Sequence, residues 1–293
     1  MTRPIVGPVV AAETLDRLAA DPTVHVVVAD VRWYLDGRDG RAAYVERHLP
    51  DALWVDLEAH LAAHGLPPTE GRHPLPDPVA FAASMSSLGI GDDTVVVAYD
   101  DTGGLSAGRL VVMLRMIGRA AALLDGGLGA WVSSGRPTAV GEGTGAGAVA
   151  GLAATFTPTP WPVDRLATAD DAARQGASGL PLIDARPFER FTGEVAVIDP
   201  RPGHIPGARS APWSAVLGDG GRFRSVEALR AHYTALGVGS GSDTIASCGS
   251  GVSACMNVLA MEHAGFASPR LFVASWSGWA SDPTRPAETG PAR

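Results

Sequence analysis

The sequence repeats itself once, and this internal repeat constrains the fold more than any other feature. Four features recur in the same order in both halves: Leu88-Gly89 and Leu236-Gly237, Trp131 and Trp279, Asp30-Val31-Arg32 and Asp184-Ala185-Arg186, and His48-Leu49-Pro50 and His204-Ile205-Pro206. The first two pairs are both 148 residues apart. Ordered matches over most of a chain indicate two copies of one structural unit.

Each half alternates β-rich runs with helical stretches. The expected strands are 24–29, 95–99 and 121–124 in the first half, and 180–183, 244–247 and 270–273 in the second. This alternation predicts an α/β fold of two tandem domains, each a parallel sheet covered by helices on both faces. A stretch rich in Gly, Ala, Thr and Pro predicts a linker at 141–160, between domains at 1–140 and 161–293.

Composition excludes several classes of function. The net charge is −8, and the charged residues form no long runs along the sequence, so neither nucleic acid nor a membrane is an expected partner. The N-terminus lacks a secretory pattern, which favours a cytoplasmic location. The sequence contains no lysine, so a P-loop lysine and a Schiff-base lysine are both excluded. Anion binding must depend on arginine and backbone N–H groups.

The most reactive stretch is the loop around Cys248, which reads Cys-Gly-Ser-Gly-Val-Ser-Ala between a predicted strand and a helix expected at 253–264. Glycines at 249 and 251 let the backbone curl so that successive N–H groups face one centre. Such a nest, with the start of the following helix, should favour Cys248 as a thiolate nucleophile. Cys255 falls inside the helix and is expected to be a core residue, with oxidation as its alternative role.

This loop resembles the active-site loop of the rhodanese superfamily, and most closely that of its 3-mercaptopyruvate sulfurtransferases. The resemblance covers nearly the whole chain and implies two tandem rhodanese-like domains. Asp100 stands in the first half where Cys248 stands in the second, so the first domain is expected to be catalytically silent. No metal or organic cofactor is expected.

The resemblance implies a two-stage sulfur transfer. Cys248 would take sulfur from 3-mercaptopyruvate as a persulfide and pass it to a thiol, such as thioredoxin or another dithiol, or to cyanide. The backbone of the loop is expected to contact the substrate through Gly249, Gly251, Val252 and Ser253. In the family, a loop serine forms a proton relay with a histidine and a carboxylate from the other domain. The matching residues here are Ser250, His73 and Glu58, with Asp56 as the alternative carboxylate.

Arginines are the expected ligands of the substrate carboxylate. Arg190 matches the family's carboxylate-binding arginine, and Arg201 is the candidate for a second one. Arg186 is a third candidate, but Arg32 repeats it in the silent half, so an ion pair with Asp184 is the favoured interpretation. By the same test, His48 and His204 are expected to support the fold.

Three alternatives remain open. A thiosulfate sulfurtransferase is the nearest, although a dianionic donor should require cations in the loop, and Gly249 and Ser250 supply none. A cysteine phosphatase of related fold would place an arginine at position 254, which is alanine. A non-enzymatic binding or sensing module is the third.

Overall fold

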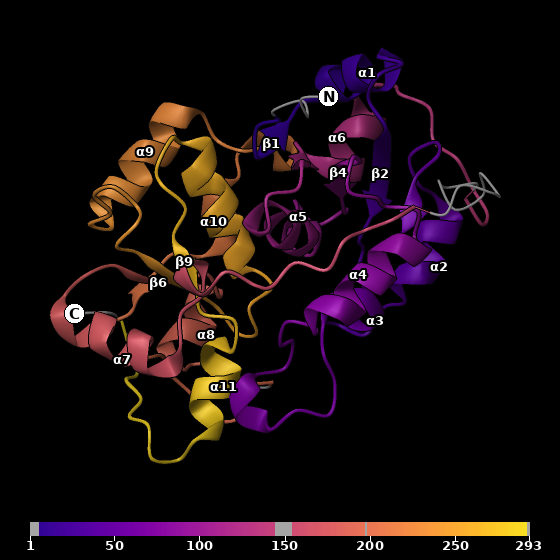
Figure 1. Cartoon of the computed structure of the whole chain (residues 1–293). Coiled ribbons are helices and arrows are strands. Elements are labelled where there is room, and N and C mark those ends of the chain that lie inside the picture. Colours follow the sequence, from indigo (N-terminus) through magenta and orange to yellow (C-terminus); the bar gives the residue numbers. More distant parts are fainter. Residues whose placement is uncertain (1–5, 144–153, 197, 292–293) are drawn as a thin grey trace. The chain divides into compact units, whose positions relative to one another are not determined.

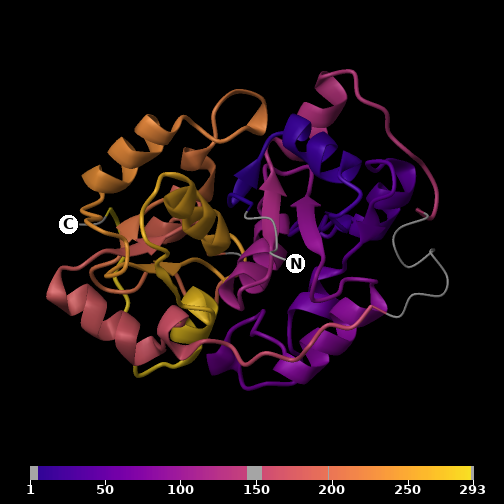
Figure 2. The ribbon, with the colours of Figure 1, turned by 45° about the horizontal axis from the view of Figure 1, so that its top comes forward.

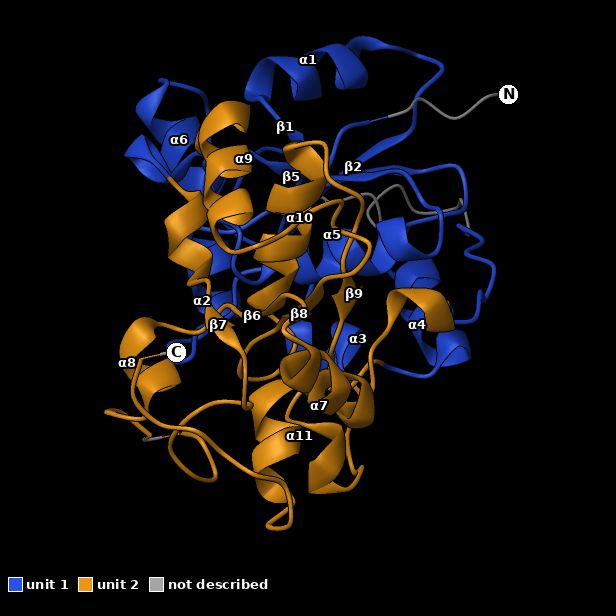
Figure 3. Ribbon diagram, turned by 90° about the vertical axis from the view of Figure 1, so that its left-hand side faces the viewer, with its two compact units in different colours: residues 1–62, 76–161, 218–223 blue, residues 63–75, 162–217, 224–293 orange. Residues whose placement is uncertain are grey.

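A computed structural model of the chain describes residues 6–143, 154–196 and 198–291, and the chain folds as two compact units (Figure 3). The N-terminal unit comprises residues 1–62, 76–161 and 218–223, and the C-terminal unit comprises 63–75, 162–217 and 224–293. Segment 63–75 therefore clusters with the second unit, although it precedes most of the first unit in sequence. The expected domain boundaries follow chain order and stay a prediction, and most of the expected linker lies outside the described residues.

The sheet of the N-terminal unit has five parallel strands in the order β1-β5-β4-β2-β3. Figure 1 labels β1, β2 and β4 among them, and Figure 2 shows the same ribbon turned by 45°. The strands are β1 (Val9–Val10), β2 (Val26–Asp30), β3 (Leu53–Trp54), β4 (Val95–Tyr99) and β5 (Ala121–Leu124). All five residues of β4 are buried. Because successive side chains on a strand point to opposite faces, both faces of this sheet are covered.

The sheet of the C-terminal unit has four parallel strands in the order β7-β6-β8-β9. They are β6 (Leu182–Asp184), β7 (Arg209–Ser210), β8 (Ile245–Ser247) and β9 (Arg270–Leu271). In place of a counterpart to β1, Leu166 forms a single parallel bridge to Leu271. The predicted α/β class with two parallel sheets is confirmed, and β1, β3 and β7 are the strands that the sequence pattern did not reveal.

Helices connect the strands in both units. Those of the N-terminal unit are α1 (Ala12–Ala20), α2 (Gly40–Glu46), α3 (Leu57–Leu61), α4 (Pro78–Ser87), α5 (Ala107–Met116), α6 (Gly127–Ser133) and η5 (Asp219–Gly221). Those of the C-terminal unit are η1 (Pro68–Glu70), η3 (Val163–Arg165), α7 (Ala169–Ser178), α8 (Phe188–Thr192), η4 (Trp213–Val216), α9 (Val226–Ala235), α10 (Ala254–His263) and α11 (Ser275–Ser281). Within the described ranges, none of these helices combines the length and the apolar character that a membrane span requires.

His48 and His204, the repeated histidines, make equivalent contacts in the two units. Nδ1 of His48 lies 2.9 Å from the Tyr44 carbonyl, and Nδ1 of His204 lies 2.9 Å from the Phe191 carbonyl. Both rings are buried and stacked on the aromatic ring of the residue whose carbonyl they contact. These contacts are those of fold-supporting residues, as the repeat predicts.

Candidate functional site

The Cys248 loop joins β8 to α10 in the C-terminal unit. Gly251 adopts a positive φ of 76°, which turns its N–H back toward the cysteine, and this N–H donates to Cys248 Sγ at 3.1 Å. The carbonyls of Cys248 and Gly249 accept hydrogen bonds at 2.9 Å from the N–H groups of Trp276 and Ser277 at the start of α11. The loop is therefore held so that an N–H dipole points at the sulfur.

Ser275 is a further residue of this site that sequence reasoning missed. Its φ of 52° lies in the left-handed region, which is uncommon for a residue other than glycine. Its hydroxyl accepts from the Cys248 N–H at 3.0 Å and lies 3.8 Å from Cys248 Sγ. The repeat contained the signal, because Gly127 occupies the matching position of the first half with a φ of 51°.

His73 contacts the loop directly. Its Nδ1 lies 2.8 Å from the Ser250 hydroxyl, and both residues are buried. The segment that carries His73 packs closely on α11, since a Cβ at Gly71 would lie 2.6 Å from the Ala274 carbonyl oxygen. The structure therefore brings together the predicted serine and histidine, and it does so within one unit.

The predicted carboxylate partners lie in the N-terminal unit. Glu58 accepts a hydrogen bond at 3.1 Å from the Trp33 indole N–H. Asp56 caps α3, where its Oδ1 accepts from the N–H of Glu58 at 2.8 Å. A helix cap is a structural task, so Glu58 is the better candidate, and its relay role stays a prediction.

Three arginines from two separate segments meet at Gly249. A Cβ atom there would lie 3.0 Å from Nη2 of both Arg190 and Arg72 and 3.7 Å from Cδ of Arg186. The loop itself carries no cation, as the sequence shows, but the space beside it is cationic. The sequence argument against a dianionic donor considered the loop alone, and it missed Arg72, which directly precedes His73.

Arg186 forms the predicted ion pair at the end of β6. Its Nη2 lies 2.7 Å from Asp184 Oδ2, with both side chains about 1% exposed. Burial opposes its charge, but Asp184, Asp199 and Cys248 together raise the Arg186 pKa. The pair Arg32–Asp30 repeats the same 2.7 Å contact in the N-terminal unit.

Arg201 makes different contacts. Its Nη2 donates to the carbonyls of Asp282 at 3.3 Å and Arg285 at 2.6 Å, so it holds the C-terminal segment. A substrate role for Arg201 stays a prediction that these contacts do not support. Val252 is a buried residue of the loop, and Ser253 is the N-cap of α10. The Cys255 thiol, in the first turn of α10, donates to the Gly251 carbonyl of the loop at 3.4 Å.

Asp100 fills the corresponding loop of the N-terminal unit with its own carboxylate. Donors to it are the N–H groups of Thr102, Gly104, Ser106 and Ala107 and the Ser106 hydroxyl, at 2.7–3.1 Å. The side chain is fully buried. The hydrogen-bond donors of this loop are thus engaged by its own side chain, and the catalytic silence of the first domain stays a prediction.

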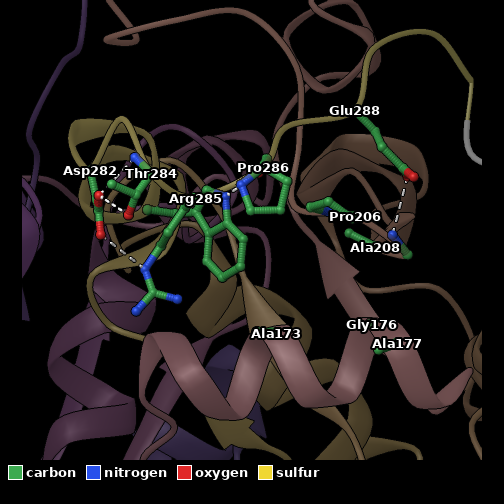
Figure 4. A pocket seen from close by; sticks show the side chains of 12 residues that line it. Ala173, Gly176, Ala177, Pro206, Ala208, Asp282, Thr284, Arg285, Pro286 and Glu288 are labelled. Carbon is green, nitrogen blue, oxygen red and sulfur yellow. Dashed lines mark hydrogen bonds and ion pairs between the residues drawn. The ribbon is translucent and has the colours of Figure 1, made fainter.

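A separate pocket of about 700 Å³ lies in the C-terminal unit between α7 and the chain end (Figure 4). Its charged groups are engaged with neighbours: Arg285 contacts Asp170 at 2.8 Å, and Glu288 accepts from the Gly207 N–H at 3.2 Å. Within the part of the chain that the structure describes, no cluster of three or more His, Cys, Asp or Glu side chains suits a metal ion. The Cys248 loop is therefore the stronger candidate site.

Comparison with known proteins identifies the family of the chain. The model of the rhodanese-like domain matches residues 11–134 and 168–282. A probable 3-mercaptopyruvate sulfurtransferase of Pseudomonas aeruginosa is 41% identical over 269 residues, which cover 90% of this chain and 93% of the relative. A putative thiosulfate sulfurtransferase of Mycobacterium tuberculosis is 40% identical over 285 residues, 97% of each chain. The solved 3-mercaptopyruvate sulfurtransferase of Leishmania major is 30% identical with a TM-score of 0.78, covering 95% of this chain and 74% of that one.

Proposed function

Since the chain belongs to the rhodanese-like domain family, we propose that it is a sulfurtransferase that moves sulfur from 3-mercaptopyruvate to a thiol or cyanide through a persulfide on Cys248. One observation carries the proposal: Cys248 Sγ accepts the Gly251 N–H at 3.1 Å, and Nη2 of Arg190 and of Arg72 would lie 3.0 Å from a Cβ at Gly249. The site thus joins a nucleophile to cations that suit a carboxylate.

In the first step the Cys248 thiolate attacks the donor sulfur. An S–S bond forms, the C–S bond breaks, and its electron pair leaves on the carbon as the enolate of pyruvate. The proton of the donor thiol ends on that carbon, which gives pyruvate and a Cys248 persulfide anion. The proposed carriers of this proton are Ser250 and His73, and the contact that supports the assignment is the 2.8 Å between Oγ and Nδ1.

The Arg190 guanidinium is the proposed ligand of the donor carboxylate. Arg72, at the same distance from Gly249, is added to the predicted set. Gly249, Gly251, Val252 and Ser253 form the loop that surrounds the transferred sulfur. The N–H groups of such a loop stabilise the negative charge of a persulfide.

In the second step an acceptor thiolate attacks the outer sulfur of the persulfide. The new S–S bond forms on the acceptor, and Cys248 leaves as a thiolate ready for another cycle. Thioredoxin or another dithiol is the proposed protein acceptor, because its second thiol can release the sulfur as sulfide. A cytoplasmic location, where such thiols are kept reduced, stays a prediction.

Thiosulfate is the second candidate donor, and the three arginines at Gly249 are the observation that favours it. Steady-state turnover on each donor, with cyanide or a dithiol as acceptor, decides between them. We expect a higher kcat/KM with 3-mercaptopyruvate, its loss in Cys248→Ser and its retention in Cys255→Ser. Greater turnover with thiosulfate would select the second candidate, and no turnover with either donor would favour the binding module.

A further inference from the structure

The arginines beside the loop share one buried carboxylate. Arg190 binds Asp199 through three contacts, from Nε at 3.1 Å and from Nη2 at 2.7 and 2.9 Å. Arg186 Nη1 lies 3.6 Å from Asp199 Oδ2, and Arg72 Nη1 lies 3.5 Å from Oδ1. Asp199 is therefore the point at which three guanidinium groups are tied together.

Burial makes the charge of Asp199 effective. Its side chain is 1% exposed, whereas Arg190 is 14% exposed and Arg72 is 31% exposed. Water screens a buried charge less than an exposed one, so the electrostatic effect of the Asp199 carboxylate on the arginines beside Gly249 is only weakly screened. The two more exposed guanidinium groups are the ones whose Nη2 atoms face Gly249.

The charges around the loop can be counted from these contacts. Arg72, Arg186 and Arg190 carry three positive charges. Asp184 neutralises one through its ion pair with Arg186, and Asp199 neutralises a second. One net positive charge remains among these arginine and aspartate side chains, and the Cys248 thiolate of the proposed mechanism reduces it further. A dianionic donor therefore gains less attraction here than it would beside the same arginines without Asp199.

We propose that Asp199 determines donor specificity, by removing one positive charge from the arginine cluster so that the site selects a monoanionic carboxylate over a dianion such as thiosulfate. This inference rests on the proposed function for its substrates but concerns a residue outside the reacting groups. Asp199 is a positioning residue that acts through Arg190 and Arg72.

The test compares Asp199→Asn with the unchanged protein. Asparagine keeps the shape of the side chain and removes its negative charge. The arginine cluster then attracts anions more strongly, and a dianionic donor gains about twice as much as a monoanionic one. We expect kcat/KM for thiosulfate relative to that for 3-mercaptopyruvate to rise about tenfold, mainly through a lower KM for thiosulfate. Raised salt should diminish the rise, because it screens the added charge.

Two further variants separate charge from structure. Asp199→Glu retains the charge and should restore the original preference. Asp36→Asn removes an aspartate that pairs with Arg38 on the exposed surface of the other unit, and it should leave the preference unchanged. A fall in turnover by the same factor for both donors in Asp199→Asn would show a merely structural role and overturn the proposal.

Equilibrium binding keeps this test independent of turnover. Titration with sulfate and with pyruvate, followed by tryptophan fluorescence or calorimetry, reports the affinity of a dianion and of a monoanion. Asp199→Asn should bind sulfate about tenfold tighter relative to pyruvate. If neither donor is turned over, the proposed function fails while this shift still supports the charge filter, and an unchanged ratio or unmeasurable sulfate binding overturns the filter itself.

Discussion

The loop after β4 and the loop after β8 each direct N–H groups at the side chain of their first residue, which is Asp100 in one and Cys248 in the other. In the N-terminal unit the Asp100 carboxylate collects four N–H groups and one hydroxyl, all within its own loop. In the C-terminal unit Cys248 accepts the Gly251 N–H and has the Ser275 hydroxyl at 3.8 Å. The comparison teaches that this loop is an anion cradle by construction, which a carboxylate fills in one unit and a thiol occupies in the other.

Length and surroundings widen the difference. The helix begins at Ala107 in one unit and at Ala254 in the other, so the Asp100 loop is one residue longer. Gly127 takes the positive φ that Ser275 takes in the second unit, and it brings no hydroxyl. The exchange of aspartate for cysteine is therefore one of several differences between the two loops.

The largest expected effect comes from exchanging the two side chains. Cys248→Asp should lose at least about 10³-fold in kcat/KM, because no nucleophile remains to form the persulfide. Asp100→Cys in a Cys248→Ser background should restore no turnover, since a thiol there would lack the Ser250–His73 contact and the arginines at Gly249. Sulfur transfer by the doubly changed protein would show that occupant identity alone makes the loop reactive.

The proton relay is the next test. Ser250→Ala and His73→Asn should each lower kcat for 3-mercaptopyruvate by about 10²-fold with little change in KM, because proton transfer is lost and binding is kept. The pH dependence of kcat should flatten in both variants. His64→Asn, at an exposed position of the same segment, serves as the control and should retain full activity. An unchanged kcat in both variants would show that the Ser250–His73 contact serves packing and not proton transfer.

The repeated ion pairs should be equivalent in stability. Asp30→Asn and Asp184→Asn each remove the nearer carboxylate partner of a buried arginine, at 2.7 Å, and each should lower the free energy of unfolding by about 3 kcal/mol. Urea unfolding measures both. Exposed Asp36→Asn, also paired with an arginine, should cost less than about 1 kcal/mol. If Asp184→Asn left stability unchanged while abolishing activity, the pair would belong to the site and the structural interpretation would be wrong.

The smallest expected effect is a pH dependence of stability. Burial lowers the pKa of His204 from its ordinary value of 6.5, against the opposing pull of the Phe191 carbonyl. The folded state then binds fewer protons than the unfolded state below that value, so stability falls as pH drops from about 7 to 5. His204→Gln should flatten this dependence, relative to a His25→Gln control. A slope unchanged by His204→Gln would contradict the assignment.

Much of this comparison could be predicted from sequence, because the repeat aligns the halves and parallel sheets follow from their alternation. The predicted strand 95–99 coincides with β4, and the helix predicted at 253–264 contains α10. The edge strands β1, β3 and β7 have two residues each, too few for a periodic pattern.

The arginine cluster could not be predicted in the same way. Arg72, Arg190 and Gly249 come from three distant segments, and periodicity says nothing of which loops meet. Asp199 carries no local signal either, since its importance arises from burial beside three guanidinium groups.

The most direct test of the account is the mass of the protein after exposure to 3-mercaptopyruvate without an acceptor, followed by peptide mapping under non-reducing conditions. The account predicts one additional sulfur atom per chain, on the peptide at Cys248, removed by cyanide and absent from Cys248→Ser. Sulfur on Cys255, or turnover in a protein that never gains the mass of a sulfur atom, would contradict the assignment of the Cys248 loop as the reactive one.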